Sequence, residues 1–123
     1  MLESNNLKNL EELKMSKVEF YANKGERYQP YVDIIGHVKT DEKLKDQVTH
    51  ESHTLREEFI SYEDLCWELA EYQLIFEKGQ NKYSEKDVIK RAKEIFNSNL
   101  NYRDICWLVS SFRTYLKENK LFP

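Results

Sequence analysis

The chain contains few of the residues on which turns, disulfide frameworks and active sites depend. Its 123 residues include three Gly, two Pro, two Cys and three His. So few Gly and Pro argue against an all-β fold with many turns and against a glycine-rich phosphate loop. No apolar run approaches the roughly 20 residues that span a bilayer. The N-terminus lacks the basic and apolar segments of a secretory signal, so we expect a cytoplasmic protein.

No arrangement of residues typical of an enzyme is visible. The chain shows no Ser/His/Asp order, no glycine-flanked nucleophile and no paired-carboxylate motif. His50 and His53 have a spacing that two metal ligands on one helix can share. No further cluster of His or Cys completes such a ligand set. The sequence therefore predicts a non-enzymatic protein without a metal or another cofactor.

One pattern of residues occurs twice. Residues 61–76 read SYEDLCWELAEYQLIF and residues 101–116 read NYRDICWLVSSFRTYL. An offset of 40 residues aligns four identical residues and three pairs of like apolar or aromatic residues. This period is typical of helical repeat units, so we predict two copies of one helical unit. The identical pairs are Tyr62/Tyr102, Asp64/Asp104, Cys66/Cys106 and Trp67/Trp107.

Capping residues define the starts of the predicted helices. Ser61 and Asn101 can each accept a hydrogen bond from the backbone three residues later, where Asp64 and Asp104 lie. An acid in the first turn also suits the helix dipole, so we assign these Asp residues a structural role. The helices predicted on this basis, and on apolar spacing that includes Phe59, are 41–60, 62–78, 85–98 and 102–118.

The N-terminal third has features of β-structure. Residues 17–22 alternate apolar and polar side chains, and residues 27–38 are rich in Tyr and β-branched residues. Gly25 suits a turn between them, so we predict a β-hairpin over residues 17–38. Residues 1–14 are polar and are predicted to form a flexible arm. Met15 leaves two candidates for the native start, Met1 and Met15.

These elements together predict a helix-dominated α+β domain over residues 15–123. In this fold, the β-hairpin is followed by two helical hairpins, residues 41–78 and residues 85–118, related by the repeat. Cys66 and Cys106 each precede a Trp within a predicted helix. Such free Cys are typically buried and reduced. A disulfide or a metal site is the alternative for these two thiols.

The Trp residues provide the main indication of a binding surface. At about 100° per residue, Trp107 lies about 160° from the apolar face of its helix. Its helical neighbours are polar, and Trp is the residue most enriched at interface hot spots. We therefore expect it to contact a protein partner; the alternative is that another segment covers one or both indoles. The predicted contact residues are Trp107, Trp67, Arg103, Ser111 and Thr114.

Charge is divided unevenly along the chain, whose net charge is −3. Residues 1–76 carry 9 Lys and Arg against 16 Asp and Glu, or −7, and residues 77–123 carry 10 against 6, or +4. This division fits two solvated surfaces, head-to-tail self-association or a half that faces nucleic acid. The last case is the alternative function, a nucleic-acid-binding regulator that uses helices 85–98 and 102–118. Its contact residues would be Lys82, Lys86, Lys90, Arg91 and Lys93.

The first hypothesis from the sequence is a small binding protein. It would act as an inhibitor or adaptor through protein–protein contacts, with self-association into a homo-oligomer as one form of that contact. The composition, rich in Lys, Asn and Tyr, is typical of a low-GC bacterium or of its phages and other mobile elements.

Overall fold

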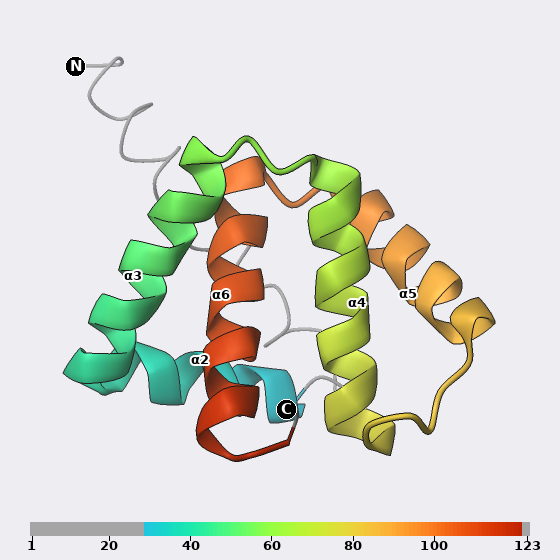
Figure 1. Ribbon diagram of the computed structural model, residues 1–123, viewed down its shortest axis with the longest axis horizontal. Coiled ribbons are helices and arrows are strands. Elements are labelled where there is room, and N and C mark those ends of the chain that lie inside the picture. The colour runs from blue at the N-terminus through green and yellow to red at the C-terminus, as the bar shows by residue number, and fades with distance from the viewer. Residues whose placement is uncertain (1–28, 122–123) are drawn as a thin grey trace, which may run out of the picture.

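The computed structural model describes residues 29–121, and these residues form helices joined by short connections (Figure 1). No β-strand is present among them. The predicted α+β class is therefore wrong for this part of the chain, and residues 1–28 lie outside the described residues. The helices are α2 (Gln29–Thr40), α3 (Glu42–Glu57), α4 (Tyr62–Lys78), α5 (Glu85–Asn97) and α6 (Tyr102–Glu118).

The segment predicted as the second strand of the hairpin is helix α2. Its buried residues are Tyr31, Ile34, Ile35 and Val38, which follow the three- and four-residue spacing of one helix face. The β-branched content of this segment favoured a strand, but the burial of one helical face outweighed that propensity. Pro30 fits the first turn of α2 because no backbone N–H is needed there.

The remaining helices lie close to their predicted positions. Helices α4 and α6 match the predicted ranges 62–78 and 102–118, and α5 ends one residue early. Helix α3 begins after Asp41, whose side chain accepts from the Leu44 N–H at 3.1 Å. It ends at Glu57 and not at residue 60, so Phe59 falls outside the helix and is 87% exposed.

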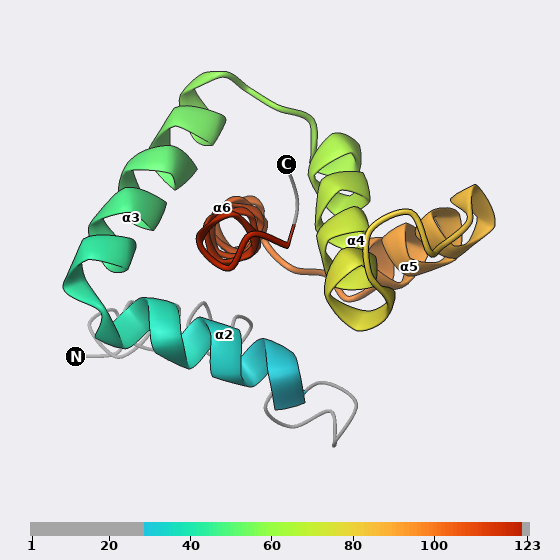
Figure 2. The same ribbon diagram turned by 60° about the horizontal axis from the view of Figure 1, so that its bottom comes forward.

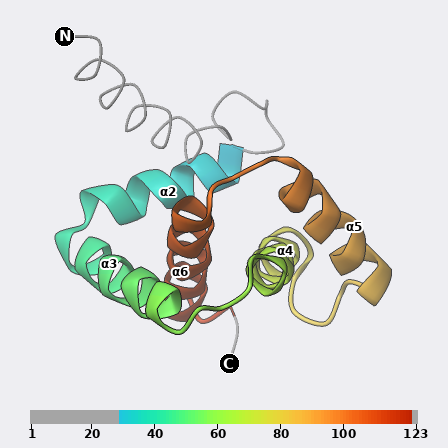
Figure 3. The ribbon, with the colours of Figure 1, turned by 90° about the horizontal axis from the view of Figure 1, so that it is seen from above.

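Helix α3 packs on α6, α6 on α4, and α4 on α5, so these four helices form a row in the order α3, α6, α4, α5 (Figures 1 and 3). Helix α2 lies across one side of this row and packs on α3 and α6. The connection from α3 to α4 runs along one side of the row, and the connection from α5 to α6 runs along the opposite side (Figure 3).

The two predicted helical hairpins do not close on themselves. Helix α3 packs on α6, and α5 packs on α4, whereas neither α3 with α4 nor α5 with α6 makes a comparable contact. The first helix of each repeat unit therefore packs on the second helix of the other unit. This exchanged pairing differs from the predicted pairing, although the helices themselves are nearly those predicted.

An approximate two-fold axis relates the two units. Helices α4 and α6 run parallel, with their N-termini side by side (Figure 1). The Tyr62 hydroxyl donates to the Leu100 carbonyl at 2.6 Å, and the Tyr102 hydroxyl donates to the Ile60 carbonyl at 2.5 Å. Because the offset of 40 residues converts one bond into the other, the repeat in the sequence is also a symmetry of the fold.

The connections that precede α4 and α6 are related by the same two-fold axis. Phe59 and Asn99 are equivalent, and both have a left-handed backbone, with φ of 54° and 60°. Such a φ is uncommon for a residue with a bulky side chain such as Phe. Ser61 and Asn101 then cap α4 and α6 by accepting from the N–H three residues later, at 3.1 and 2.8 Å. The predicted caps are thus confirmed.

Equivalent apolar residues of α4 and α6 form the centre of the core. Cys66 and Cys106 are free thiols, and both are buried, as the sequence predicted. Their equivalent neighbours are buried too, so the repeated pattern marks the surfaces on which the two units meet. These neighbours are Leu65 with Ile105, and Leu69 with Val109.

The reciprocal tyrosine bonds provide a symmetric test of this fold. We expect Tyr62→Phe and Tyr102→Phe each to lower the free energy of unfolding by about 1 kcal/mol, since each leaves a carbonyl without its donor. Urea unfolding followed by circular dichroism measures both variants. A large loss in one variant with no loss in the other would contradict the reciprocal arrangement.

Candidate functional site

Helices α3 and α4 lie on either side of α6 (Figure 2). Two hollows lie on this side of the fold, and we call them together the α3–α4 groove. The lower hollow lies between the start of α3 and the end of α6, and the upper hollow lies between the end of α3 and the start of α4. The lower hollow has a volume of about 580 Å³ and the upper hollow about 490 Å³. The lower hollow is lined by Asp41, Lys43, Leu44, Gln47, His50, Glu51, Thr114, Lys117 and Glu118, and the upper by Leu55, Glu58, Ile60, Asp64, Trp67, Glu68 and Arg113.

Arg113 of α6 lines the upper hollow and joins α3 to α4. Its guanidinium forms ion pairs with Glu51 of α3 and, at 2.8 Å, with Glu68 of α4. Its Nε donates to the Tyr72 hydroxyl at 2.9 Å, and the guanidinium carbon lies 5.8 Å from the centre of that ring. One side chain therefore ties together two helices that do not pack on each other.

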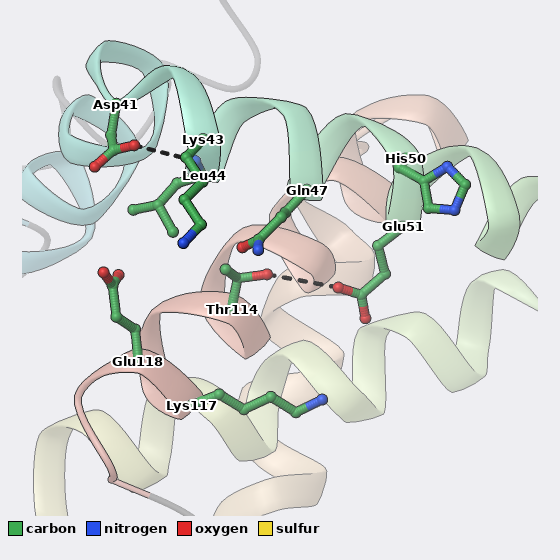
Figure 4. Close-up of a pocket in the computed structure, with 9 residues that line it drawn as sticks. All are labelled: Asp41, Lys43, Leu44, Gln47, His50, Glu51, Thr114, Lys117 and Glu118. Atoms are coloured by element: carbon green, nitrogen blue, oxygen red, sulfur yellow. Dashed lines mark hydrogen bonds between the residues drawn. The ribbon is translucent and has the colours of Figure 1, made fainter.

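This network also keeps the Arg113 guanidinium protonated. Burial alone would lower the pKa of Arg113, but the hydrogen bonds to Tyr72 and Glu51 and the charge of Glu68 outweigh burial and raise it. Glu51 also lies 3.5 Å from the Thr114 hydroxyl, at the edge of the lower hollow (Figure 4). The upper hollow thus contains a fixed positive charge that is paired with carboxylates.

The upper hollow combines an exposed indole with an acidic rim. Trp67 is 37% exposed, and its Nε1 donates to Glu71 Oε1 at 2.6 Å. Leu55 and Ile60 supply apolar surface beside it. The charged residues that line this hollow are three acids and one base, namely Glu58, Asp64, Glu68 and Arg113.

Phe59 adds a second exposed aromatic residue at this end of the groove. It lies in the chain between Glu58 and Ile60, both of which line the upper hollow. Sequence reasoning assigned Phe59 to the buried face of a helix extended to residue 60, so its exposure was missed. The two acids before it, Glu57 and Glu58, were the available signal that the helix ends before residue 59.

The structure brings only two of the predicted contact residues to the groove. Trp67 lines the upper hollow and Thr114 the lower one. Trp107 is partly buried and packs against the core, and Ser111 is fully buried and donates to the Trp107 carbonyl at 2.7 Å. Arg103 is exposed but lines neither hollow. A partner contact through Trp107 stays a prediction.

The basic residues predicted to contact nucleic acid are also not all at the surface. Arg91 is buried and pairs with Glu77, and its Nη1 also donates to Gln73 Oε1 at 3.0 Å. It is therefore not at the surface where a phosphate would bind. The four remaining residues are exposed on or near α5, where Glu85 and Glu94 offset part of their charge: Lys82, Lys86, Lys90 and Lys93.

Residues 29–121 were also compared with the requirements of a metal site and of a membrane-spanning helix. His50 is exposed, and the exposed His53 pairs with Glu57 at 2.7 Å. Across this described range, no group of three or more His, Cys, Asp or Glu is arranged to hold a metal ion. None of the helices described here is long and apolar enough to cross a membrane.

Comparisons with protein-family models, with curated proteins and with solved structures found no match to this chain.

Burial of ionisable groups at the α4–α6 contact predicts loss of stability in alkali. Burial raises the pKa of the Cys66 thiol to about 11 and that of the Tyr62 hydroxyl to about 12. Because both groups ionise more readily when unfolded, their neutral forms favour folding below the ordinary thiol pKa of 9.0. We expect the contribution of these two groups to the free energy of unfolding to be constant below that pH and to fall as the pH rises toward 11.

Urea titrations from about pH 8 to about pH 10.5 measure this loss. Cys66→Ala provides the control, because it removes one of the two groups and should make the fall shallower. A stability that does not change over this range would contradict the burial of the two groups.

Proposed function

We propose that this chain is a protein-binding module that holds a segment of a partner in the α3–α4 groove. The observation that carries the proposal is the exposed indole of Trp67 in the wall of the upper hollow. Trp combines a large apolar surface with one N–H donor, and it is enriched where interfaces concentrate their binding energy. Phe59, 87% exposed in the adjoining connection, offers a second aromatic contact.

The charge of the upper hollow favours a basic, partly apolar protein segment as its occupant. Glu58, Asp64 and Glu68 line the hollow, and Glu71 accepts from the indole. Arg113 is already paired with two carboxylates. A nucleic-acid backbone would meet like charge here, whereas a Lys or Arg beside an apolar residue would meet both a carboxylate and the indole.

The two equivalent Trp residues form a matched pair of variants. We expect Trp67→Ala to weaken partner binding by about 2 kcal/mol, or roughly 30-fold, as hot-spot Trp residues do. Its melting temperature should change little because the indole is at the surface. Trp107→Ala removes a side chain packed against the core, so it should instead lower the melting temperature by several degrees.

The experiment compares proteins captured from the cells of origin by the purified wild-type chain and by three variants. The third variant, Lys90→Glu/Lys93→Glu, controls for charge on the opposite end of the row. A partner that is retained by the wild type and by the lysine variant, but lost with folded Trp67→Ala, supports the groove. If Trp67→Ala retains the same partner as the wild type, the groove is not the binding site.

A further inference from the structure

One of the two grooves that the two-fold axis relates already holds a tyrosine of this chain. The counterpart of the α3–α4 groove lies between α5 and α6, with α4 as its floor. The Tyr31 hydroxyl of α2 donates to Glu77 of α4 and accepts from Arg91 of α5 at 3.2 Å. Its ring lies 5.5 Å from the Phe112 ring of α6 and 6.2 Å from the Phe76 ring of α4. Tyr31 thus contacts all three helices of this counterpart groove.

The lower hollow of the α3–α4 groove contains the equivalents of the two residues that bind the Tyr31 hydroxyl. By the offset of 40 residues, Glu51 is equivalent to Arg91 and Lys117 is equivalent to Glu77, and both line the lower hollow. The ring neighbours Phe76 and Phe112 correspond to Leu116 and Tyr72, which are buried and are not among the residues that line the hollow. The pair of residues that binds the Tyr31 hydroxyl is therefore repeated at the hollow with both charges reversed.

The inner polar contact is repeated as well. Arg91 donates to Gln73 across α5 and α4, and the equivalent residues Glu51 and Arg113 form an ion pair across α3 and α6. The upper part of the counterpart groove is closed, because Asp104 and Leu108 are buried. Their equivalents in the upper hollow are the exposed Asp64 and the half-buried Glu68. Within residues 29–121, the chain therefore closes one groove and leaves the equivalent groove open.

We infer that the lower hollow receives a tyrosine from a helix of the partner protein, in the way that α2 inserts Tyr31 into the counterpart groove. This inference rests on the proposed function and names the side chain that the groove selects. The hollow opens between α3 and α6, with Glu51 and Thr114 at its edge and Lys117 extending along it (Figure 4).

The reversed charges select a phenol over the other aromatic and charged side chains. A phenol hydroxyl both donates and accepts, so it can donate to Glu51 and accept from Lys117. A Phe would leave both charged groups without a new bond, and a carboxylate would be repelled by Glu51 and Glu118. Because the upper hollow is acidic, the rest of the partner helix should carry Lys or Arg.

A peptide made from α2 is a direct probe. The Tyr probe has the sequence of Gln29–Thr40 with Asp33→Lys, which removes its acidic residue, and the Ala probe also carries Tyr31→Ala. Each is titrated into the full chain labelled with ¹⁵N. We expect the Tyr probe to shift the amide signals of Glu51, Thr114 and Lys117 and to bind at least five-fold more tightly than the Ala probe. Both affinities should be weak, because a free helix of this length pays an ordering cost.

Variants of the full chain test the assigned bond. Lys117→Ala is at the surface and should weaken the Tyr probe several-fold without weakening the Ala probe, while Lys93→Ala should change neither. Equal affinity of the two probes, an absence of shifts at millimolar peptide, or shifts confined to the surroundings of Arg91 and Glu77 would overturn the inference. The peptide titrations test only the inferred tyrosine contact. The proposed function is tested separately, by whether Trp67→Ala loses the partner that the wild type captures.

Discussion

Helices α4 and α6 lie parallel with their N-termini together, and the first residue of each donates its hydroxyl to the chain just before the other. Burial along this contact places Cys66 and Cys106 in the core, where their neutral forms are favoured. The outer helices depend on it, because α3 packs on α6 and α5 packs on α4. Neither unit of the repeat can bury its apolar surface without the other.

The exchanged pairing also explains why a groove exists. Because consecutive helices do not close on each other, each central helix has one outer helix and one central helix beside it, with an opening between them. Among residues 29–121, helix α2 has no equivalent in the other unit, and its Tyr31 occupies one of the two openings. In this described part of the chain, α2 covers one of the two equivalent positions, and the other remains a groove in which Arg113 joins α3 to α4.

The sequence predicted most of the helices but not their pairing. Caps at Ser61 and Asn101 are local signals, and they placed the starts of α4 and α6 correctly. Short connections usually join neighbours that pack, which favoured closed hairpins. The connections contain the left-handed residues Phe59 and Asn99, and nothing in the sequence signals such a φ for Phe. Trp67 was found as the equivalent of Trp107 in the repeat, whereas Arg113 was missed because its carboxylate partners are distant in the sequence.

Long-range nuclear Overhauser effects between side chains test the exchanged pairing most directly. We expect cross-peaks from the buried residues Val48 and Leu55 of α3 to side chains of α6, and from Val88 and Ile95 of α5 to side chains of α4. Regular cross-peaks along the length of α3 to α4, or of α5 to α6, with none between the exchanged pairs, would contradict the exchanged pairing.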